Sequence, residues 1–265
     1  MYAVTEGQLS TGVPYLRLGS GPPLLVASGL SSAHANPRGV WRRMALSWLR
    51  PLAQHFTVHY VNRKPGLASG ATMADLAADY AAAIKEDIGQ PVAVHGTSTG
   101  GSVVLQLAVD YPDLVQRMVV AAAACRLSEH GRWATAELAR LAQDGNARGS
   151  SAFVTGLMVR PPFRYPAQGV GWLMGGSWKT DDPTDMVRTL TAEASFDAEP
   201  GLARVRAPTL VLGGTADPFY SEDLYRRTAA GMRDGRAVIF PGKSHPYVAG
   251  AAVPAGVALG FLIGG

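Results

Sequence analysis

Short hydrophobic runs recur along this chain, separated by longer segments in which hydrophobic residues follow a helical spacing. Each run is four to six residues long and lies between glycine, proline or polar residues, as is typical of strands buried in a parallel sheet. The runs occupy residues 24–27, 56–61, 92–95, 118–123, 209–212 and 237–240. Residues 4–10 and 13–18, joined through Thr11 and Gly12, predict a leading hairpin.

The best-defined helix is predicted over residues 73–88. Thr72 precedes it as a plausible N-cap, and Gly89 follows it as a stop signal. One hydrophobic stripe runs along it, made of Met73, Leu76, Ala77, Tyr80 and Ile84. Because strands alternate with helices, the chain predicts an α/β fold with a mostly parallel sheet and helices on both faces.

Residues 127–200 interrupt this alternation and are too many for a plain crossover between two strands. We therefore expect a core of residues 1–126 and 201–265 with a helical cap inserted at 127–200. The insertion is rich in aromatic residues, which either form the cap's own core or line an apolar pocket. The candidates for such a pocket are Trp133, Met158, Trp172, Met174 and Trp178.

Residues 96–100 read Gly-Thr-Ser-Thr-Gly and fit the pattern G-x-S-x-G. They follow the predicted strand 92–95 and precede a helical segment that begins at Gly101. A serine at such a sharp turn projects its hydroxyl above the sheet, and flanking glycines leave room for the neighbouring chain. The pattern alone is also compatible with a glycine-rich loop that contains an incidental serine.

A nucleophilic serine needs a base and a group that orients the base. Of the six histidines, His245 lies in a turn-rich segment after the last predicted strand, where a loop histidine can reach the sheet edge. The others lie in or beside predicted strands (His55, His59, His95) or in predicted polar loops (His34, His130). Asp217 follows the strand 209–212 and is the candidate acid; its nearby competitors are Glu222 and Asp223.

The order Ser98, Asp217, His245, each after the expected strand, resembles the α/β-hydrolase superfamily over nearly the whole chain. The resemblance implies that Ser98 is the nucleophile, that His245 is the general base and acid, and that Asp217 orients it. It also implies an oxyanion hole formed by the backbone N–H groups of Thr99 and Leu30.

Two segments depart from the family pattern. Many relatives have His-Gly after the first parallel strand, whereas this chain has Ser28-Gly29-Leu30. Relatives often carry an Asp-Arg-x-Gly-x-Gly-x-Ser type of loop, whereas residues 62–69 read Asn-Arg-Lys-Pro-Gly-Leu-Ala-Ser. We interpret residues 62–69 as a structural loop.

Composition agrees with one enzyme domain and narrows the list of partners. The 265 residues are 47% hydrophobic, with a net charge of +4. Basic residues are scattered rather than clustered with aromatics, which argues against nucleic-acid binding. A single cysteine excludes an internal disulfide, and neither a metal nor a cofactor motif is present. The N-terminus lacks a signal-peptide pattern, and residues 248–265 are too broken for a membrane span and predict a last amphipathic or buried helix instead. We therefore expect a cytoplasmic protein; the oligomeric state is not indicated.

The sequence therefore predicts a serine hydrolase that cleaves an ester or lactone of an apolar small molecule. The alternatives on the same triad are thioester hydrolysis, C–C bond hydrolysis and cofactor-free perhydrolysis. A different class is also possible: a non-catalytic small-molecule receptor that retains the fold and the pocket.

Overall fold

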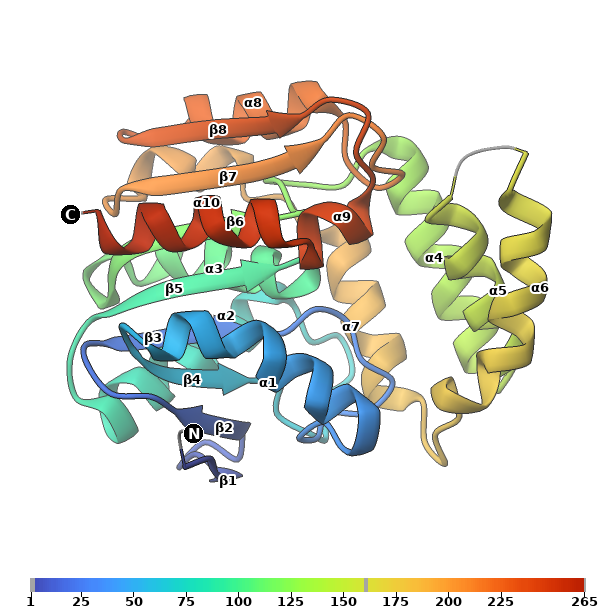
Figure 1. Ribbon diagram of the computed structural model, residues 1–265, viewed down its shortest axis with the longest axis horizontal. Coiled ribbons are helices and arrows are strands. Elements are labelled where there is room, and N and C mark those ends of the chain that lie inside the picture. Colours follow the sequence, from blue (N-terminus) through green and yellow to red (C-terminus); the bar gives the residue numbers. More distant parts are fainter. Residues whose placement is uncertain (1–2, 160–161, 265) are drawn as a thin grey trace.

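An eight-stranded sheet lies at the centre of the computed structural model, which describes residues 3–159 and 162–264 (Figure 1). Its strands follow the order β1-β2-β4-β3-β5-β6-β7-β8. They are β1 (Thr5–Gln8), β2 (Pro14–Leu18), β3 (Pro23–Ala27), β4 (Thr57–Val61), β5 (Val92–Thr97), β6 (Val115–Ala121), β7 (Thr209–Gly214) and β8 (Gly235–Phe240). β1 and β2 form an antiparallel hairpin, and β3 to β8 all run parallel. The predicted hairpin, the six predicted strands and the α/β fold class are confirmed.

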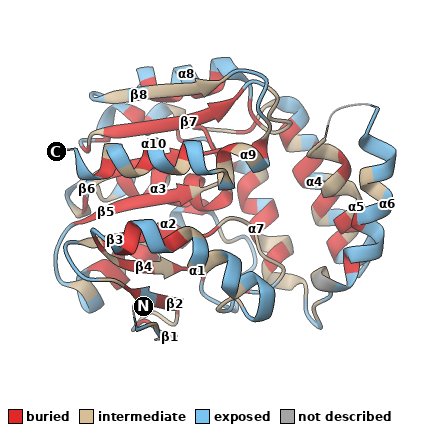
Figure 2. Cartoon of the chain, in the orientation of Figure 1, coloured by how far each residue is buried: buried red, intermediate tan, exposed pale blue. Residues whose placement is uncertain are grey.

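Helices cover both faces of this sheet (Figure 1). Residues of α2 (Met73–Ala83), α3 (Thr99–Asp110) and α8 (Glu222–Ala230) pack into one hydrophobic core, and those of α1 (Gly39–Ala53) and α10 (Ala252–Ile263) into another. Successive strand residues alternate between the two cores, as the pleat of a sheet requires. Figure 2 shows the central strands and the inward sides of these helices as buried. The sheet is therefore buried on both faces, which explains its uninterrupted hydrophobic runs.

The predicted helix at 73–88 forms with the predicted ends. The Thr72 side chain accepts a hydrogen bond from the N–H of Asp75, and the Asp75 carboxylate accepts from the N–H of Thr72, which is a capping box. α2 continues into a π-helical turn, η1 (Ile84–Ile88), and ends at Gly89, whose φ is +76°. Gly89 adopts a left-handed conformation that glycine tolerates best.

Between β6 and β7, the described residues 122–159 and 162–208 form four α-helices beyond the carboxyl edge of the parallel strands (Figure 1). They are α4 (Glu129–Gln143), α5 (Ala147–Leu157), α6 (Arg164–Met174) and α7 (Thr184–Ser195), with short 3₁₀ turns η3 (Gly175–Trp178) and η4 (Glu199–Arg204). A small hydrophobic cluster joins α4 and α7, formed by Leu138, Ala142, Met186 and Leu190. The inserted segment is thus helical, as expected, and lies over the edge where the candidate site residues follow their strands.

Three local features differ from the sequence expectations. Helix α1 had not been predicted. The C-terminal stretch at 248–265, expected to be a single helix, takes part in two, α9 (His245–Gly250) and α10, which meet at Ala251. His130, expected in a polar loop, lies in the first turn of α4. None of the helices described is both long enough and apolar enough to cross a membrane.

Candidate active site

Ser98 lies at a strained turn between β5 and α3. Its φ of 54° and ψ of −127° are unusual for a residue with a side chain. A Cβ on Gly96 would lie 2.3 Å from the carbonyl oxygen of Gly100, and one on Gly100 would lie 2.3 Å from that of Ala27. The two glycines of G-x-S-x-G are therefore required by neighbouring backbone, which confirms the steric reason given for the pattern.

The three residues that the sequence proposed as a triad are brought together. His245 Nε2 lies 3.0 Å from Ser98 Oγ, and His245 Nδ1 lies 2.8 Å from Asp217 Oδ2. Because an ionised carboxylate only accepts, Nδ1 carries the proton that it donates to Asp217. A neutral His245 then presents the lone pair of Nε2 to the Ser98 hydroxyl, which is the arrangement of a general base.

Asp217 is held by four donors. Its Oδ1 accepts from the backbone N–H groups of Phe219 (2.8 Å) and Tyr220 (3.3 Å), while Oδ2 accepts from Tyr225 Oη (2.7 Å) as well as from His245. Burial raises the pKa of the Tyr225 hydroxyl well above its usual value, so this group remains a donor at neutral pH. The Asp217 side chain is 0% exposed, and its competitors Glu222 and Asp223 lie in the exposed first turn of α8.

Aromatic rings enclose His245. The Phe219 ring packs edge-on, with ring centroids 5.1 Å apart, and the Tyr220 ring is stacked at 6.4 Å. Both residues also donate backbone N–H groups to Asp217, so one short loop after β7 fixes the acid and encloses the base. The His245 side chain is only 7% exposed, which keeps its ring in one orientation.

The loop after β3 borders Ser98. A Cβ on Gly29 would lie 3.6 Å from Ser98 Cβ, so this loop passes directly beside the turn. The side chain of Leu30 packs against the hydrophobic cluster of α4 and α7. Thr99 is the first residue of α3, and the first N–H groups of a helix have no partner within it. The two backbone donors suggested by the family pattern thus belong to segments that lie against Ser98.

Sequence reasoning missed a buried polar group beneath this loop. Arg63 is 0% exposed, and its Nη1 donates to the carbonyl oxygens of Ser28 (3.2 Å) and Gly29 (3.1 Å). Its Nη2 donates to Ser31 Oγ (3.0 Å) and its Nε to His34 Nε2 (3.2 Å). No hydropathy signal could have located Arg63, because an arginine in a Pro-Gly loop is normally exposed.

A buried carboxyl group, Glu193 of α7, was also missed. Its Oε1 accepts from Ser102 Oγ (2.6 Å) in the first turns of α3 and from Tyr220 Oη (3.1 Å). Burial raises the pKa of Glu193. Oε2 has no hydrogen-bond partner within the described ranges. Glu193 thereby joins the insertion to the helix behind Ser98 and to the loop that encloses His245.

The five proposed pocket residues occupy different surroundings. Trp178 packs against the α4–α7 cluster together with Leu30. Trp133 is half exposed on α4, and its ring contacts that of Phe153 at 5.8 Å. The Trp172 ring is covered on one side by the Arg148 guanidinium at 4.4 Å. Met158 directly follows α5 and is partly exposed, and Met174 is exposed at the end of α6.

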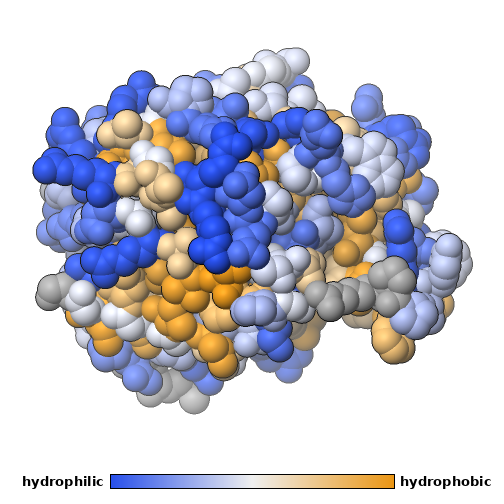
Figure 3. Space-filling model, turned by 90° about the horizontal axis from the view of Figure 1, so that it is seen from above, coloured by the Kyte–Doolittle hydropathy of each residue, from blue (hydrophilic) through white to orange (hydrophobic). Residues whose placement is uncertain are grey.

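Hydrophobic side chains also reach the surface of this insertion. Figure 3 shows orange atoms over both the main body and the inserted helices at its right. The exposed members on and beside α6 are Phe163, Tyr165, Val170, Trp172, Leu173 and Met174. Trp178 packs against the same cluster as Leu30 of the loop after β3, and the lining of the pocket stays a prediction.

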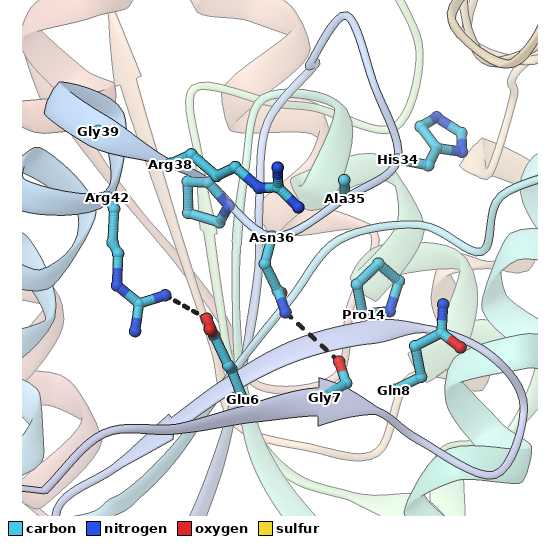
Figure 4. A pocket seen from close by; sticks show the side chains of 11 residues that line it. Glu6, Gly7, Gln8, Pro14, His34, Ala35, Asn36, Arg38, Gly39 and Arg42 are labelled. Carbon is cyan, nitrogen blue, oxygen red and sulfur yellow. Dashed lines mark hydrogen bonds and ion pairs between the residues drawn. The ribbon is translucent and has the colours of Figure 1, made fainter.

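A crevice of about 620 Å³ lies away from Ser98, between the β1–β2 hairpin and the segment that leads into α1 (Figure 4). Arg42 pairs with Glu6 across it, and Asn36 Nδ2 donates to the carbonyl of Gly7 (3.4 Å). Arg38 also lines it and is an exposed residue. Over residues 3–159 and 162–264, no three histidine, cysteine or carboxylate side chains form a group that could hold a metal ion.

Comparison with known proteins agrees with the fold. The model of the "Alpha/beta hydrolase family" matches residues 24–258. "Putative carbamate hydrolase RutD" of Variovorax paradoxus (strain S110) is 28% identical over 244 residues, which cover 86% of each chain. A hydrolase from Pseudomonas aeruginosa PA01 has a TM-score of 0.77 at 20% identity, covering 98% of both chains. The enol-lactonase from Burkholderia xenovorans LB400 has a TM-score of 0.77 at 16% identity, covering 97% of this chain and 99% of that one. The two structures show a shared fold.

Proposed function

The chain belongs to the α/β-hydrolase family, and from this premise we propose that it is a serine hydrolase that cleaves an ester or lactone of an apolar small molecule. The observation that supports it best is the unbroken series of hydrogen bonds from Ser98 Oγ through His245 to Asp217. Such a series is what an acyl-enzyme mechanism requires of its nucleophile, base and orienting acid.

In the first half-reaction Ser98 Oγ attacks the substrate carbonyl while His245 Nε2 takes the hydroxyl proton. The negative oxygen of the tetrahedral intermediate accepts from the N–H groups of Thr99 and Leu30, and donors of this kind contribute about 3 kcal/mol each. When the intermediate collapses, His245 returns the proton to the leaving alcohol oxygen. The products of this step are an acyl ester on Ser98 and a free alcohol, or one ring-opened chain from a lactone.

In the second half-reaction water takes the place of the alcohol. His245 removes a proton from the water as it attacks the acyl carbonyl, and the same two N–H groups stabilise the new oxyanion. Collapse returns the proton to Ser98 Oγ and releases the carboxylic acid. Asp217 stays ionised throughout and stabilises the imidazolium that forms twice in each cycle.

An apolar substrate fits the surroundings of the nucleophile. Leu30 and Trp178 pack against one apolar cluster beside the loop that borders Ser98, and the insertion above exposes further aromatic and methionine side chains. A carbamate is the second candidate, since the Variovorax relative carries that name. It would present its carbonyl to the same serine, with an amine as the leaving group if the C–N bond breaks.

Replacing Ser98 with alanine tests the nucleophile. With p-nitrophenyl esters of increasing chain length, Ser98→Ala should lower kcat by about 10⁶-fold, the scale of losing a triad nucleophile. A fluorophosphonate should label Ser98 in the parent protein and leave the variant unlabelled. The matched control is Ser195→Ala, an exposed serine on α7, which should stay within about two-fold of the parent.

Substrate class is tested by a parallel series of p-nitrophenyl carbamates of matched size. Higher kcat/KM for medium-chain esters than for short esters and carbamates is the expected result. A preference for carbamates would move the assignment to the second candidate. Retention of a tenth of the parent rate in Ser98→Ala, or labelling elsewhere than Ser98, would contradict the mechanism itself.

A further inference from the structure

Arg63 is a completely buried cation whose hydrogen bonds converge on the loop after β3. Two go to the carbonyls of Ser28 and Gly29 and one to Ser31 Oγ. In the described parts of the chain no carboxylate lies within ion-pair distance of its guanidinium. Burying a guanidinium costs several kcal/mol unless its donors are bonded, so these contacts are what hold the charge in the protein.

The contact with Gly29 fixes the direction of the next N–H group. A trans peptide is planar, with its C=O and N–H on opposite sides. Because the Gly29 carbonyl is turned to Arg63 at 3.1 Å, the N–H of Leu30 in the same peptide is directed away from Arg63. Gly29 is also the residue of this loop that borders Ser98. One side of the peptide is thus anchored by the guanidinium, and the other side is available to the reacting oxygen.

We infer that Arg63 is the positioning residue of the oxyanion hole: by holding the carbonyls of Ser28 and Gly29, its guanidinium aims the Leu30 N–H at the developing oxyanion. The inference rests on the proposed function. It gives a role to the loop at 62–69, and it concerns the segment where this chain has Ser28 in place of the family's usual histidine. Arg63 does not touch the substrate; it acts through the loop.

His34 holds the guanidinium from its other side. Its Nδ1 donates to the carbonyl of Lys64 (2.9 Å), which leaves Nε2 as an acceptor for Arg63 Nε. Burial, followed by the charge of Arg63, lowers the pKa of His34 to about 4, while Asp185 beside it acts in the opposite direction. His34 is therefore neutral at pH 7, and its ring accepts a hydrogen bond from Arg63 without placing a second positive charge beside the guanidinium.

Arg63→Lys is the direct test, because it keeps a positive charge but loses the fork that reaches two carbonyls and Ser31. We expect kcat to fall by about 30–100-fold with KM within about two-fold, which is less than the roughly 10²–10³-fold loss seen when one oxyanion donor is removed outright, because the Leu30 N–H is misdirected rather than absent. The Ki of a trifluoromethyl ketone, whose hemiketal oxygen occupies the oxyanion hole, should rise by the same factor as kcat/KM falls. Lys64→Met, an exposed neighbour in the same loop, is the control and should change neither value.

Ser31→Ala provides a second variant if Arg63→Lys does not fold. It removes one of four acceptors from the guanidinium, so kcat should fall several-fold with KM unchanged. The inference is overturned if kcat of either folded variant matches the parent, or if kcat falls while ketone affinity does not. Fluorophosphonate labelling of Ser98 in the parent separates this inference from the proposed function. If the parent is neither labelled nor active, the proposed function is wrong. If the parent is active and the variants are equally active, only the role of Arg63 is contradicted.

Discussion

Replacing Asp217 with asparagine tests whether this residue sets the tautomer of His245. The change keeps the shape of the side chain and alters its charge and its hydrogen-bond donors and acceptors. Oδ1 accepts from two backbone N–H groups, and Oδ2 faces Tyr225 Oη and His245 Nδ1. An asparagine satisfies the two N–H groups only with its oxygen in the Oδ1 position. Its NH₂ then points at His245 Nδ1, which must become an acceptor.

That tautomer places the imidazole proton on Nε2, opposite Ser98 Oγ, where it cannot remove a proton. The flipped amide would restore the correct tautomer but would set an NH₂ group against the N–H groups of Phe219 and Tyr220. Each unsatisfied buried donor costs about 1–3 kcal/mol, so the productive orientation lies about 2–6 kcal/mol higher and is about 30- to 10⁴-fold rarer. Loss of the negative charge beside the imidazolium adds to this, and we expect kcat to fall by about 10⁴-fold.

The assay is steady-state hydrolysis of the best p-nitrophenyl ester, with the thermal unfolding midpoint measured alongside. Glu222→Gln and Asp223→Asn are matched controls, because these exposed carboxylates form only surface ion pairs with Arg226 and Arg227 and should stay within about two-fold. The reasoning is refuted if Asp217→Asn keeps a tenth of the parent activity while one of the controls loses most of its own.

Two further predictions concern residues behind the nucleophile. Gly100→Ala places a Cβ 2.3 Å from the Ala27 carbonyl oxygen, so it should displace the turn at Ser98 and lower both kcat and the unfolding midpoint. The control is Gly256→Ala on α10, where a Cβ would meet open space; it should lower neither kcat nor the midpoint. Burial lowers the pKa of His95 to about 4 from 6.5, so between these values the unfolded chain binds a proton that the folded chain does not, and stability falls as pH falls. In urea titrations, the free energy of unfolding of His95→Phe should fall between pH 7 and pH 4.5 by about 2 kcal/mol less than that of the parent. If the two proteins lose the same free energy over this pH range, the burial argument is contradicted.

Hydrophobic periodicity predicted the sheet but not helix α1. The strands are buried on both faces, so nearly every residue in them had to be apolar. In α1 only Leu49, Leu52 and Ala53 are buried, all in its last turns, while Trp41 and Met44 are exposed. Apolar residues at 41, 44, 45, 48, 49 and 52 do have a helical spacing, but the arginines in the first half of α1 and Pro51 within it weakened that signal. The packing of its last turns on the sheet, which a local pattern does not contain, fixes where the helix lies.

The triad candidates were accessible to sequence reasoning because each follows a recognisable strand, and parallel strands end at one edge. The buried polar groups that support the neighbouring helix and loops could not be predicted in this way. Glu193 meets Ser102 across 91 residues of sequence, and Arg63 meets Gly29 across 34. Both are charged side chains that composition assigns to the surface. Their burial depends on partners that only the folded chain brings together, and no spacing rule relates them.

Helix α7 is joined to the core more firmly than its place within residues 127–200 suggests. Asp185 accepts from the N–H groups of Gly66 and Leu67 (both 2.8 Å), and Thr189 Oγ1 lies 3.2 Å from His34 Nε2. Glu193 accepts from Ser102 on α3 and from Tyr220. Displacing α7 would leave the buried hydroxyl groups of Ser102 and Tyr220 without their acceptor, at about 1–3 kcal/mol for each. α7 is therefore fixed to the core, and we expect adaptation to a substrate in α6 instead, where Val170, Trp172 and Leu173 are exposed.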